Sequence, residues 1–186
     1  MSYKEEIIDY AENKGEVDKW LALKGETKYM KFADLLKAHN VSLHWVSLRD
    51  TYRYDKRLLV NIFKYLSFFE EFLRAQIWNN TKISYIEIES ISFNDTMSKV
   101  ANNADIQYDG FDGNVLMQNK EYINYLRNRV CHNKIMLTSK KHGKDITQLL
   151  SLLANTLPTS HKKGFLDDIN KCTCGLHVDK AFIVNI

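Results

Sequence analysis

One short stretch of the sequence spaces an arginine, an amide and a histidine in a way that suits phosphoryl-transfer chemistry. The three residues are Arg127, Asn128 and His132. An imidazole can accept or donate a proton near neutral pH. A guanidinium can hold a phosphate and stabilise the charge that develops in the transition state, and an amide can orient either partner. The three residue types therefore suit cleavage of a phosphodiester bond.

RNA is the substrate class that these three groups could cleave without a metal or cofactor. The 2′-hydroxyl of RNA is an internal nucleophile, so the reaction needs no metal and no cofactor. The expected products carry a 2′,3′-cyclic phosphate and a 5′-hydroxyl. These groups would therefore suit a metal-independent endoribonuclease, in which Arg127, Asn128 and His132 are the catalytic residues.

The helix expected to carry these residues begins near Val115 and runs to about Leu137. At roughly 100° per residue, one side of it is apolar and must face the core. Those apolar positions are Ile123, Leu126, Val130 and Leu137. Asn124, Asn128 and His132 then line up on nearly the opposite side, with Arg127 between the two sides. Such a polar stripe fits a polar site or a symmetric interface.

A second long helix, from Asp55 to about Asn79, is the strongest element that the sequence predicts. Its apolar residues recur at three- and four-residue steps; they are Leu58, Leu59, Ile62, Phe63, Leu66, Phe69, Leu73 and Ile77. Asp55 stands near the expected start, where a carboxylate complements the helix dipole. Glu70 and Arg74 are four residues apart, so they can pair on the surface of this helix. They are either an ordinary ion pair or residues that brace the motif or bind substrate.

The remaining segments complete an all-α expectation of a helical bundle, with a small helical extension at residues 1–40 and the main domain at 41–186. Residues 82–100 are ambiguous, because β-branched and aromatic residues hint at a strand that helical neighbours can override. Residues 102–114 read as a loop. Asp145 is expected to cap a helix that reaches Leu157. Thr159 or Ser160 then caps a last helix ending near Cys172, and residues 176–186 form a strand-like tail.

A basic turn at residues 138–144 follows the motif helix and contains Lys140, Lys141, His142 and Lys144. Lys140 and Lys141 either lie in a solvated loop or guide RNA phosphates electrostatically. The formal net charge of the chain is +3, a mild excess that permits contact with RNA and does not require it. Tyr52 and Tyr54 are most simply core residues, although either ring would also stack on a base.

The motif resembles the Arg-x-x-x-x-His signature of HEPN domains, with a polar residue directly after the arginine. A second stretch strengthens the resemblance. The run from Tyr52 to Leu59, continuing from Phe68 to Arg74, is similar to the Abi (abortive infection) family run of Tyr-x-Phe-Asp-x-x-Leu leading to Ile-Glu-x-x-Leu-Arg. The two stretches occur in the same order and at similar spacing as in that family, and the likeness covers roughly residues 45–160.

The resemblance implies a HEPN-like helical bundle that forms a homodimer, in which two Arg/His motifs face each other and build one RNA-cleaving site. By this likeness His132 is the general acid/base, Arg127 binds the phosphate or stabilises the transition state, and Asn128 positions the reacting groups. The implied setting is a bacterial anti-phage or toxin–antitoxin response, with an antitoxin protein or a non-coding RNA as a further partner.

Two rival readings of the polar stripe remain open. The first is a HEPN module that binds a structured RNA or an antitoxin without cutting, because a fold does not by itself imply an activity. The second is a purely structural dimer seam. A thiol nucleophile at Cys131 is disfavoured, since a neighbour of His132 points about 100° away on a helix.

The cysteines of the chain also raise a zinc alternative. His161, Cys172, Cys174 and His177 supply four residues of the right types, but the Cys-x-Cys spacing is tighter than usual. Free thiols are the simpler interpretation. Three cysteines, a polar N-terminus and the lack of an apolar run that could span a bilayer together favour a cytoplasmic protein with no membrane partner.

Overall fold

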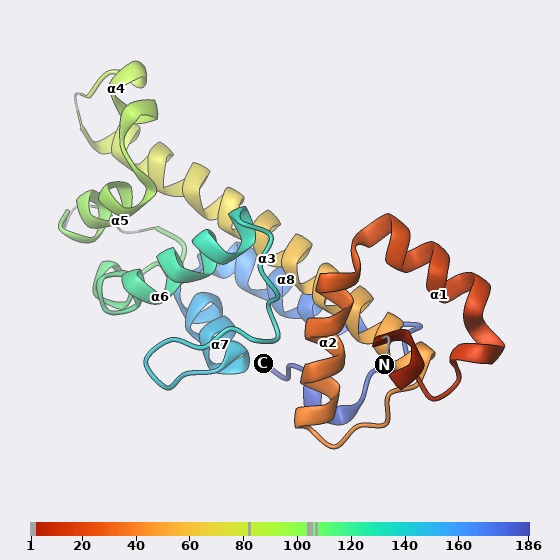
Figure 1. Cartoon of the computed structure of the whole chain (residues 1–186). Coiled ribbons are helices and arrows are strands. Elements are labelled where there is room, and N and C mark those ends of the chain that lie inside the picture. The colour runs from red at the N-terminus through yellow and green to blue at the C-terminus, as the bar shows by residue number, and fades with distance from the viewer. Residues whose placement is uncertain (1–2, 82, 104–105, 107) are drawn as a thin grey trace. The chain divides into compact units, whose positions relative to one another are not determined.

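The computed structural model describes residues 3–81, 83–103, 106 and 108–186 (Figure 1). Its regular elements are η1 (Tyr3–Glu6), α1 (Tyr10–Lys24), α2 (Glu26–Ala38), α3 (Trp45–Asn80), α4 (Tyr85–Ser90), α5 (Phe93–Ala101), α6 (Gly113–Cys131), α7 (Ile146–Thr156), α8 (Thr159–Asn170), η2 (Lys171–Thr173) and η3 (Lys180–Phe182). These described residues contain helices and no strand, so the all-α class predicted from the sequence is confirmed.

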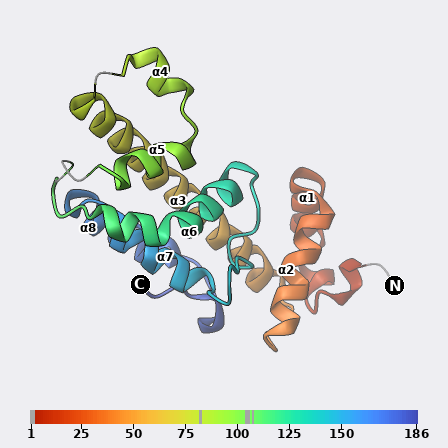
Figure 2. The ribbon, with the colours of Figure 1, turned by 90° about the vertical axis from the view of Figure 1, so that its left-hand side faces the viewer.

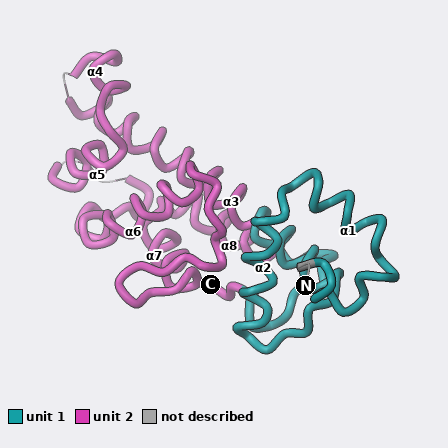
Figure 3. Tube along the Cα trace, in the orientation of Figure 1, with its two compact units in different colours: residues 1–57, 172–183 teal, residues 58–171, 184–186 magenta. Residues whose placement is uncertain are grey.

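The chain divides into two compact units, which Figure 3 shows in separate colours. Unit 1 comprises Met1–Arg57 and Cys172–Ile183, and unit 2 comprises Leu58–Lys171 and Val184–Ile186. The division therefore falls inside α3, whereas the sequence placed a boundary at residue 40.

The helix α3 begins ten residues before the position that periodicity predicts, because a contact within unit 1 caps its first residue. The Asp9 carboxylate accepts a 2.7 Å hydrogen bond from the backbone N–H of Trp45, which is the first residue of the helix. This cap comes from a distant part of the chain and satisfies one of the orphan donors at the helix start. Asp55, expected near the helix start, lies well inside α3 and is buried, so that expectation is wrong.

The core of unit 1 is aromatic. The Tyr29 ring stacks on Tyr52 with centroids 4.9 Å apart, and Phe32 meets the same ring edge-on. Tyr52 and Tyr54 are both buried, so neither ring is exposed to a nucleotide base, and the core interpretation of these residues holds.

Unit 2 holds the motif helix among its neighbours. Figures 1 and 2 show α6 lying beside α5 and α7, with α7 beside α8. The part of α3 in this unit packs against α8, where Tyr65 and Phe165 make an edge-to-face contact. Asp168 on α8 accepts hydrogen bonds from Lys64 at 2.8 Å and from the Tyr65 hydroxyl at 3.0 Å. These two donors hold the pKa of Asp168 below its ordinary value.

The ambiguous segment 82–100 contains α4 and most of α5, which overturns the strand hint; Lys82 lies outside the described residues. Two serine caps explain the outcome. The Ser84 side chain and Glu87 form a reciprocal capping box at the start of α4, and Ser92 caps α5 by accepting from the backbone N–H of Asp95. Such local hydrogen bonds fix the first turn and outweigh a weak β preference.

The C-terminal half departs from the sequence expectations at three points. Neither Thr159 nor Ser160 caps α8; instead the loop residue Asp109 accepts from the Thr159 N–H through its carbonyl and from the Ser160 N–H through its carboxylate. The loop expected at residues 102–114 is confirmed where it is described, but α6 begins at Gly113. The tail forms η3, with no strand among its residues, and Phe182 packs against the ring of His39. The predicted cap of α7 is confirmed, because Asp145 forms a capping box with Gln148.

Candidate functional site

The candidate site lies at the C-terminal end of α6. Asp112 caps this helix by accepting from the N–H of Asn114 at 2.7 Å. Its core face is buried at Leu116, Asn119, Ile123, Leu126 and Val130, as the spacing predicts from Ile123 onward. The buried Asn119 amide donates to the Thr156 hydroxyl of α7 at 3.1 Å, which fixes the rotation of α6 about its axis. That rotation decides which residues the helix turns away from the core.

The helix ends at Cys131 rather than near Leu137, because Asn133 adopts a left-handed conformation with φ 50°. The N–H of Asn133 donates to the Val130 carbonyl, and the N–H of Lys134 donates to the Arg129 carbonyl, both at 3.0 Å. This pair of bonds is the Schellman arrangement, in which asparagine can replace the usual glycine. His132 is therefore the C-cap residue of α6, not an interior one.

After this turn the chain folds back along α6 and is fastened to three successive turns of the helix. Nearest the helix end, the Arg129 guanidinium donates to the Ile135 carbonyl and, at 3.0 Å, to the Thr138 hydroxyl. One turn earlier, the Tyr125 hydroxyl accepts from the backbone N–H of Lys140 at 3.1 Å. We call residues 134–144 the strap.

Glu121 fastens the far end of the strap, where Lys141 and Lys144 exchange backbone hydrogen bonds across a tight turn. Its carboxylate lies 2.7 Å from the Lys141 ammonium and 2.9 Å from Nε2 of His142. These two contacts, with Lys141 contributing most, lower the pKa of Glu121 to about 2. The turn places His142 and Gly143 at φ 48° and 80°, as a type I′ turn requires.

With one side of α6 buried and a second covered by the strap, a third side stays open. It carries Arg127, Asn128 and Cys131 and ends at His132. Asn128 and His132 are exposed, and Arg127 is half-buried. Within the part of the chain that the structure describes, the side chains of Arg127, Asn128 and His132 have no hydrogen-bond or ion-pair partner. The three groups are thus available to a ligand.

The surroundings of this open side are basic. Between Glu121 and Asp145 the chain contains no acidic residue and six basic ones, which are Arg127, Arg129, Lys134, Lys140, Lys141 and Lys144. Glu121 balances part of that charge, since it contacts Lys141 and His142. Lys134 and Lys140 are exposed. An excess of positive charge around an open polar stripe favours a phosphate-bearing ligand.

The structure divides the two lysines singled out in the sequence. Lys140 is exposed, and its backbone N–H donates to the Tyr125 hydroxyl, while its ammonium has no ion-pair partner among the described residues. Lys141 is half-buried and paired with Glu121. The ammonium of Lys140 is therefore the freer of the two for phosphate contact, and Lys141 fastens the strap.

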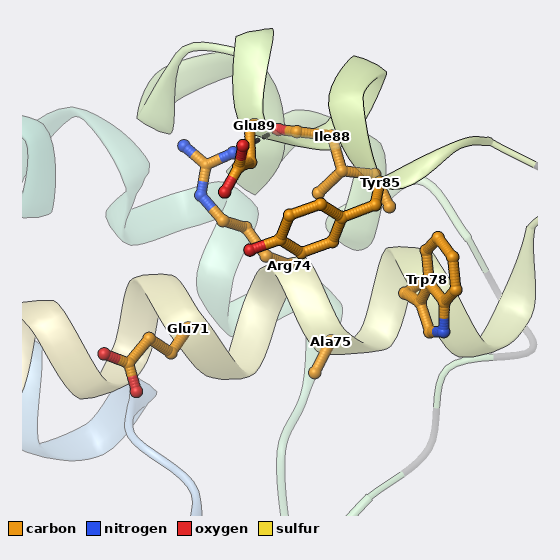
Figure 4. Close-up of a pocket in the computed structure, with 7 residues that line it drawn as sticks. All are labelled: Glu71, Arg74, Ala75, Trp78, Tyr85, Ile88 and Glu89. Carbon is orange, nitrogen blue, oxygen red and sulfur yellow. Dashed lines mark hydrogen bonds between the residues drawn. The ribbon is translucent and has the colours of Figure 1, made fainter.

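Glu70 and Arg74 pair as their spacing predicts, with Arg74 2.7 Å from the Glu70 carboxylate. Arg74 also donates to the carbonyls of Ile88 and Ile91, and Figure 4 shows its guanidinium beside α4. The pair thus anchors the C-terminal end of α4 to α3. Among the described residues, no hydrogen bond of Glu70 or Arg74 reaches the motif.

The zinc alternative finds no support in the described residues, since no three of their His, Cys, Asp and Glu side chains lie together as a metal site would need. None of the three cysteines forms a disulfide; Cys172 is buried, and Cys131 and Cys174 are exposed. The described residues also include no helix that is long and apolar enough to cross a bilayer.

Sequence reasoning found the open stripe from periodicity, but it missed the strap contacts of Glu121, Tyr125 and Arg129. Arg129 lies two residues from Arg127, and nothing in the sequence distinguishes a fastening arginine from a free one. One sequence feature does indicate that the helix ends early. Asn133 followed by Lys134 is compatible with a helix C-terminus.

Comparison with known proteins adds no identification to this geometry. No family model, no curated protein and no solved structure matches the chain. The class that the fold and the site define is therefore an all-α protein with a basic, open Arg/Asn/His stripe at the end of α6.

Proposed function

We propose that this protein is a metal-independent endoribonuclease of the HEPN type, acting as a homodimer in a bacterial anti-phage or toxin–antitoxin response in the cytoplasm. The observation that carries the proposal is the state of Arg127, Asn128 and His132. Their side chains share the open side of α6 without a partner among the described residues, in a segment with six basic and no acidic residues.

The chemistry assigned to these residues is a transesterification. The 2′-oxygen of RNA attacks the adjacent phosphorus, and the bond from phosphorus to the 5′-oxygen breaks. A base takes the proton of the 2′-hydroxyl, and an acid gives a proton to the departing 5′-oxygen. Arg127 binds the phosphate and stabilises its extra negative charge, and Asn128 orients the reacting groups.

A homodimer supplies what one chain lacks. The reaction needs a base and an acid together, and each chain offers one histidine on this stripe. Two open stripes that face each other would provide two His132 imidazoles, one for each proton transfer, and two Arg127 guanidinium groups for one phosphate. Lys140 adds electrostatic attraction at the rim of the site.

The test is cleavage of end-labelled RNA by wild type, Arg127→Ala and His132→Ala, all with EDTA present. We expect wild type to leave 2′,3′-cyclic phosphate ends. Each variant should cut at least about 100-fold more slowly, because general acid–base catalysis and transition-state charge stabilisation each contribute that much or more. The matched controls are His177→Ala and Lys163→Ala, which remove an exposed histidine and an exposed cation elsewhere and should cut at the wild-type rate.

Two other outcomes would support the two alternative hypotheses, a non-catalytic binding module and a structural dimer interface. RNA binding that survives in all forms without any cleavage would identify a non-catalytic module for a structured RNA or an antitoxin, a role that the basic segment also suits. Folded, dimeric protein with no affinity for RNA would identify a structural dimer seam. Cleavage that EDTA abolishes would refute the metal-independent mechanism.

A further inference from the structure

Unit 2 also contains a surface pocket whose residues precede the Arg127/Asn128/His132 motif in the sequence. It is a pocket of about 680 Å³ between the last turns of α3 and the short helix α4. Figure 4 shows its seven lining residues, which are Glu71, Arg74, Ala75, Trp78, Tyr85, Ile88 and Glu89. None of them belongs to the site proposed for RNA cleavage.

The pocket is held in shape by Arg74. Its guanidinium donates to the Ile88 carbonyl and, at 3.0 Å, to the Ile91 carbonyl, so it fixes the end of α4 over α3. The same guanidinium pairs with Glu70 at 2.7 Å. The positive charge of Arg74 is thus balanced by Glu70, and each of its three side-chain nitrogens donates to a protein group.

Two aromatic rings form the wall of the pocket. The rings of Trp78 and Tyr85 meet edge-to-face with centroids 6.2 Å apart, and in Figure 4 they lie next to each other above and beside α3. Trp78 is 51% exposed and Tyr85 62%, and the neighbouring Ile86 on α4 is 80% exposed. The contact between the two exposed rings makes a continuous apolar patch, and such patches mark interaction surfaces.

Two carboxylates add negative charge to the lining of the pocket. Glu71 and Glu89 line the pocket and are exposed. Among the described residues neither forms an ion pair with a lysine, arginine or histidine. A hydrogen bond to Glu89 raises the pKa of the Tyr85 hydroxyl. With Arg74 already balanced by Glu70, the described lining carries a net negative charge.

We propose that this pocket docks a partner polypeptide by binding one of its arginine or lysine side chains, with an apolar neighbour of that residue resting on Ile86. Charge complementarity with Glu71 and Glu89 favours a cation, and the faces of Trp78 and Tyr85 favour it further through cation–π attraction. A polypeptide is the source because Ile86, which follows Tyr85 on α4, is an exposed apolar side chain that a small free cation would leave uncovered.

The test follows the indole N–H signal of Trp78 by NMR, while the peptide acetyl-Leu-Arg-Leu-amide is added to the full chain. The chain has three tryptophans, and the signal lost in Trp78→Phe identifies the one of interest. We expect a saturable shift with a Kd on the order of 1 mM for so short a probe. The same peptide with glutamine in place of arginine should bind about fivefold more weakly.

The double variant Glu71→Gln/Glu89→Gln should also weaken binding of the arginine peptide about fivefold, since exposed ion pairs contribute modestly. The matched control is Glu5→Gln/Glu12→Gln, which makes the same change in net charge at exposed positions of unit 1 and should bind like wild type. Both variants should keep the wild-type helical circular dichroism, because none of the four glutamates is buried.

Three results would overturn the proposal. The Trp78 signal does not move with peptide, or the glutamine peptide binds as tightly as the arginine peptide, or free arginine binds as tightly as the tripeptide. The last result would indicate a small-molecule site instead of a docking surface. None of these readouts depends on RNA cleavage, so the docking proposal and the ribonuclease proposal are tested independently.

Discussion

Two arginines on α6, only two residues apart, offer a sharp test of the site. Arg129→Ala removes the guanidinium that fastens the strap at Ile135 and Thr138. Arg127→Ala removes a guanidinium of the open side, for which the described residues provide no partner. Both changes replace arginine with alanine in the last turns of the same helix, so helix propensity nearly cancels in the comparison.

The contacts of Arg129 set the size of the difference. Hydrogen bonds to a charged group contribute about 1.5–3 kcal/mol each, and Arg129 makes two such bonds besides a longer one to Tyr125. Because the strap is partly exposed, we expect Arg129→Ala to lower the free energy of unfolding by about 2–3 kcal/mol. The midpoint of thermal unfolding should fall by about 4–12 °C for a chain of this size.

Arg127→Ala should change the free energy of unfolding by less than about 0.5 kcal/mol, as surface substitutions usually do. Urea unfolding followed by circular dichroism measures both values, and the RNA-cleavage assay is run on the same samples. Arg127→Ala should be stable and inactive, whereas Arg129→Ala is destabilised. Equal destabilisation by the two changes, or a fully stable Arg129→Ala protein, would refute the division of α6 into a strap side and an open side.

Two further predictions concern the strap and the helix end. Carbon-detected NMR should give a pKa of about 2 for the Glu121 carboxyl. In Lys141→Ala this pKa should return toward 4.5, because Lys141 contributes most to its lowering. Since the folded-state pKa is below the unfolded one, the stabilisation from Glu121 is complete above about pH 4.5 and is lost as the pH falls toward 2; an unchanged pKa in Lys141→Ala would contradict the contact. Asn133→Val should lower the free energy of unfolding by about 1–2 kcal/mol, because a β-branched residue is strained at φ 50°. It should also slow RNA cleavage by displacing His132. Stability equal to wild type in urea would show that this turn does not determine where α6 ends.

Local patterns predicted those parts of the fold in which local forces decide the outcome. The apolar spacing of α3 and of the core face of α6 was enough to predict both helices, and Asp145 was enough to predict the start of α7. The strand hint at residues 82–100 failed because serine caps at Ser84 and Ser92 are stronger than a β preference.

Elements fixed by distant contacts escaped sequence reasoning. The start of α3 depends on Asp9, far away in the sequence, and the cap of α8 comes from Asp109 across a loop. The same holds for the candidate site. Its open stripe follows from helical periodicity, but the strap that covers the neighbouring side of α6 depends on hydrogen bonds between residues up to 21 positions apart, such as Glu121 and His142.

The three-sided construction of α6 has a consequence for which substitutions the helix would tolerate. In a saturation mutagenesis screen scored for abundance, intolerant positions should recur on the core side and at Glu121, Tyr125 and Arg129, whereas Arg127 and Asn128 should accept almost any residue that favours a helix. Scored for activity, the open side should become the intolerant one. One helix would then show two complementary substitution profiles, so abundance and activity could be changed independently.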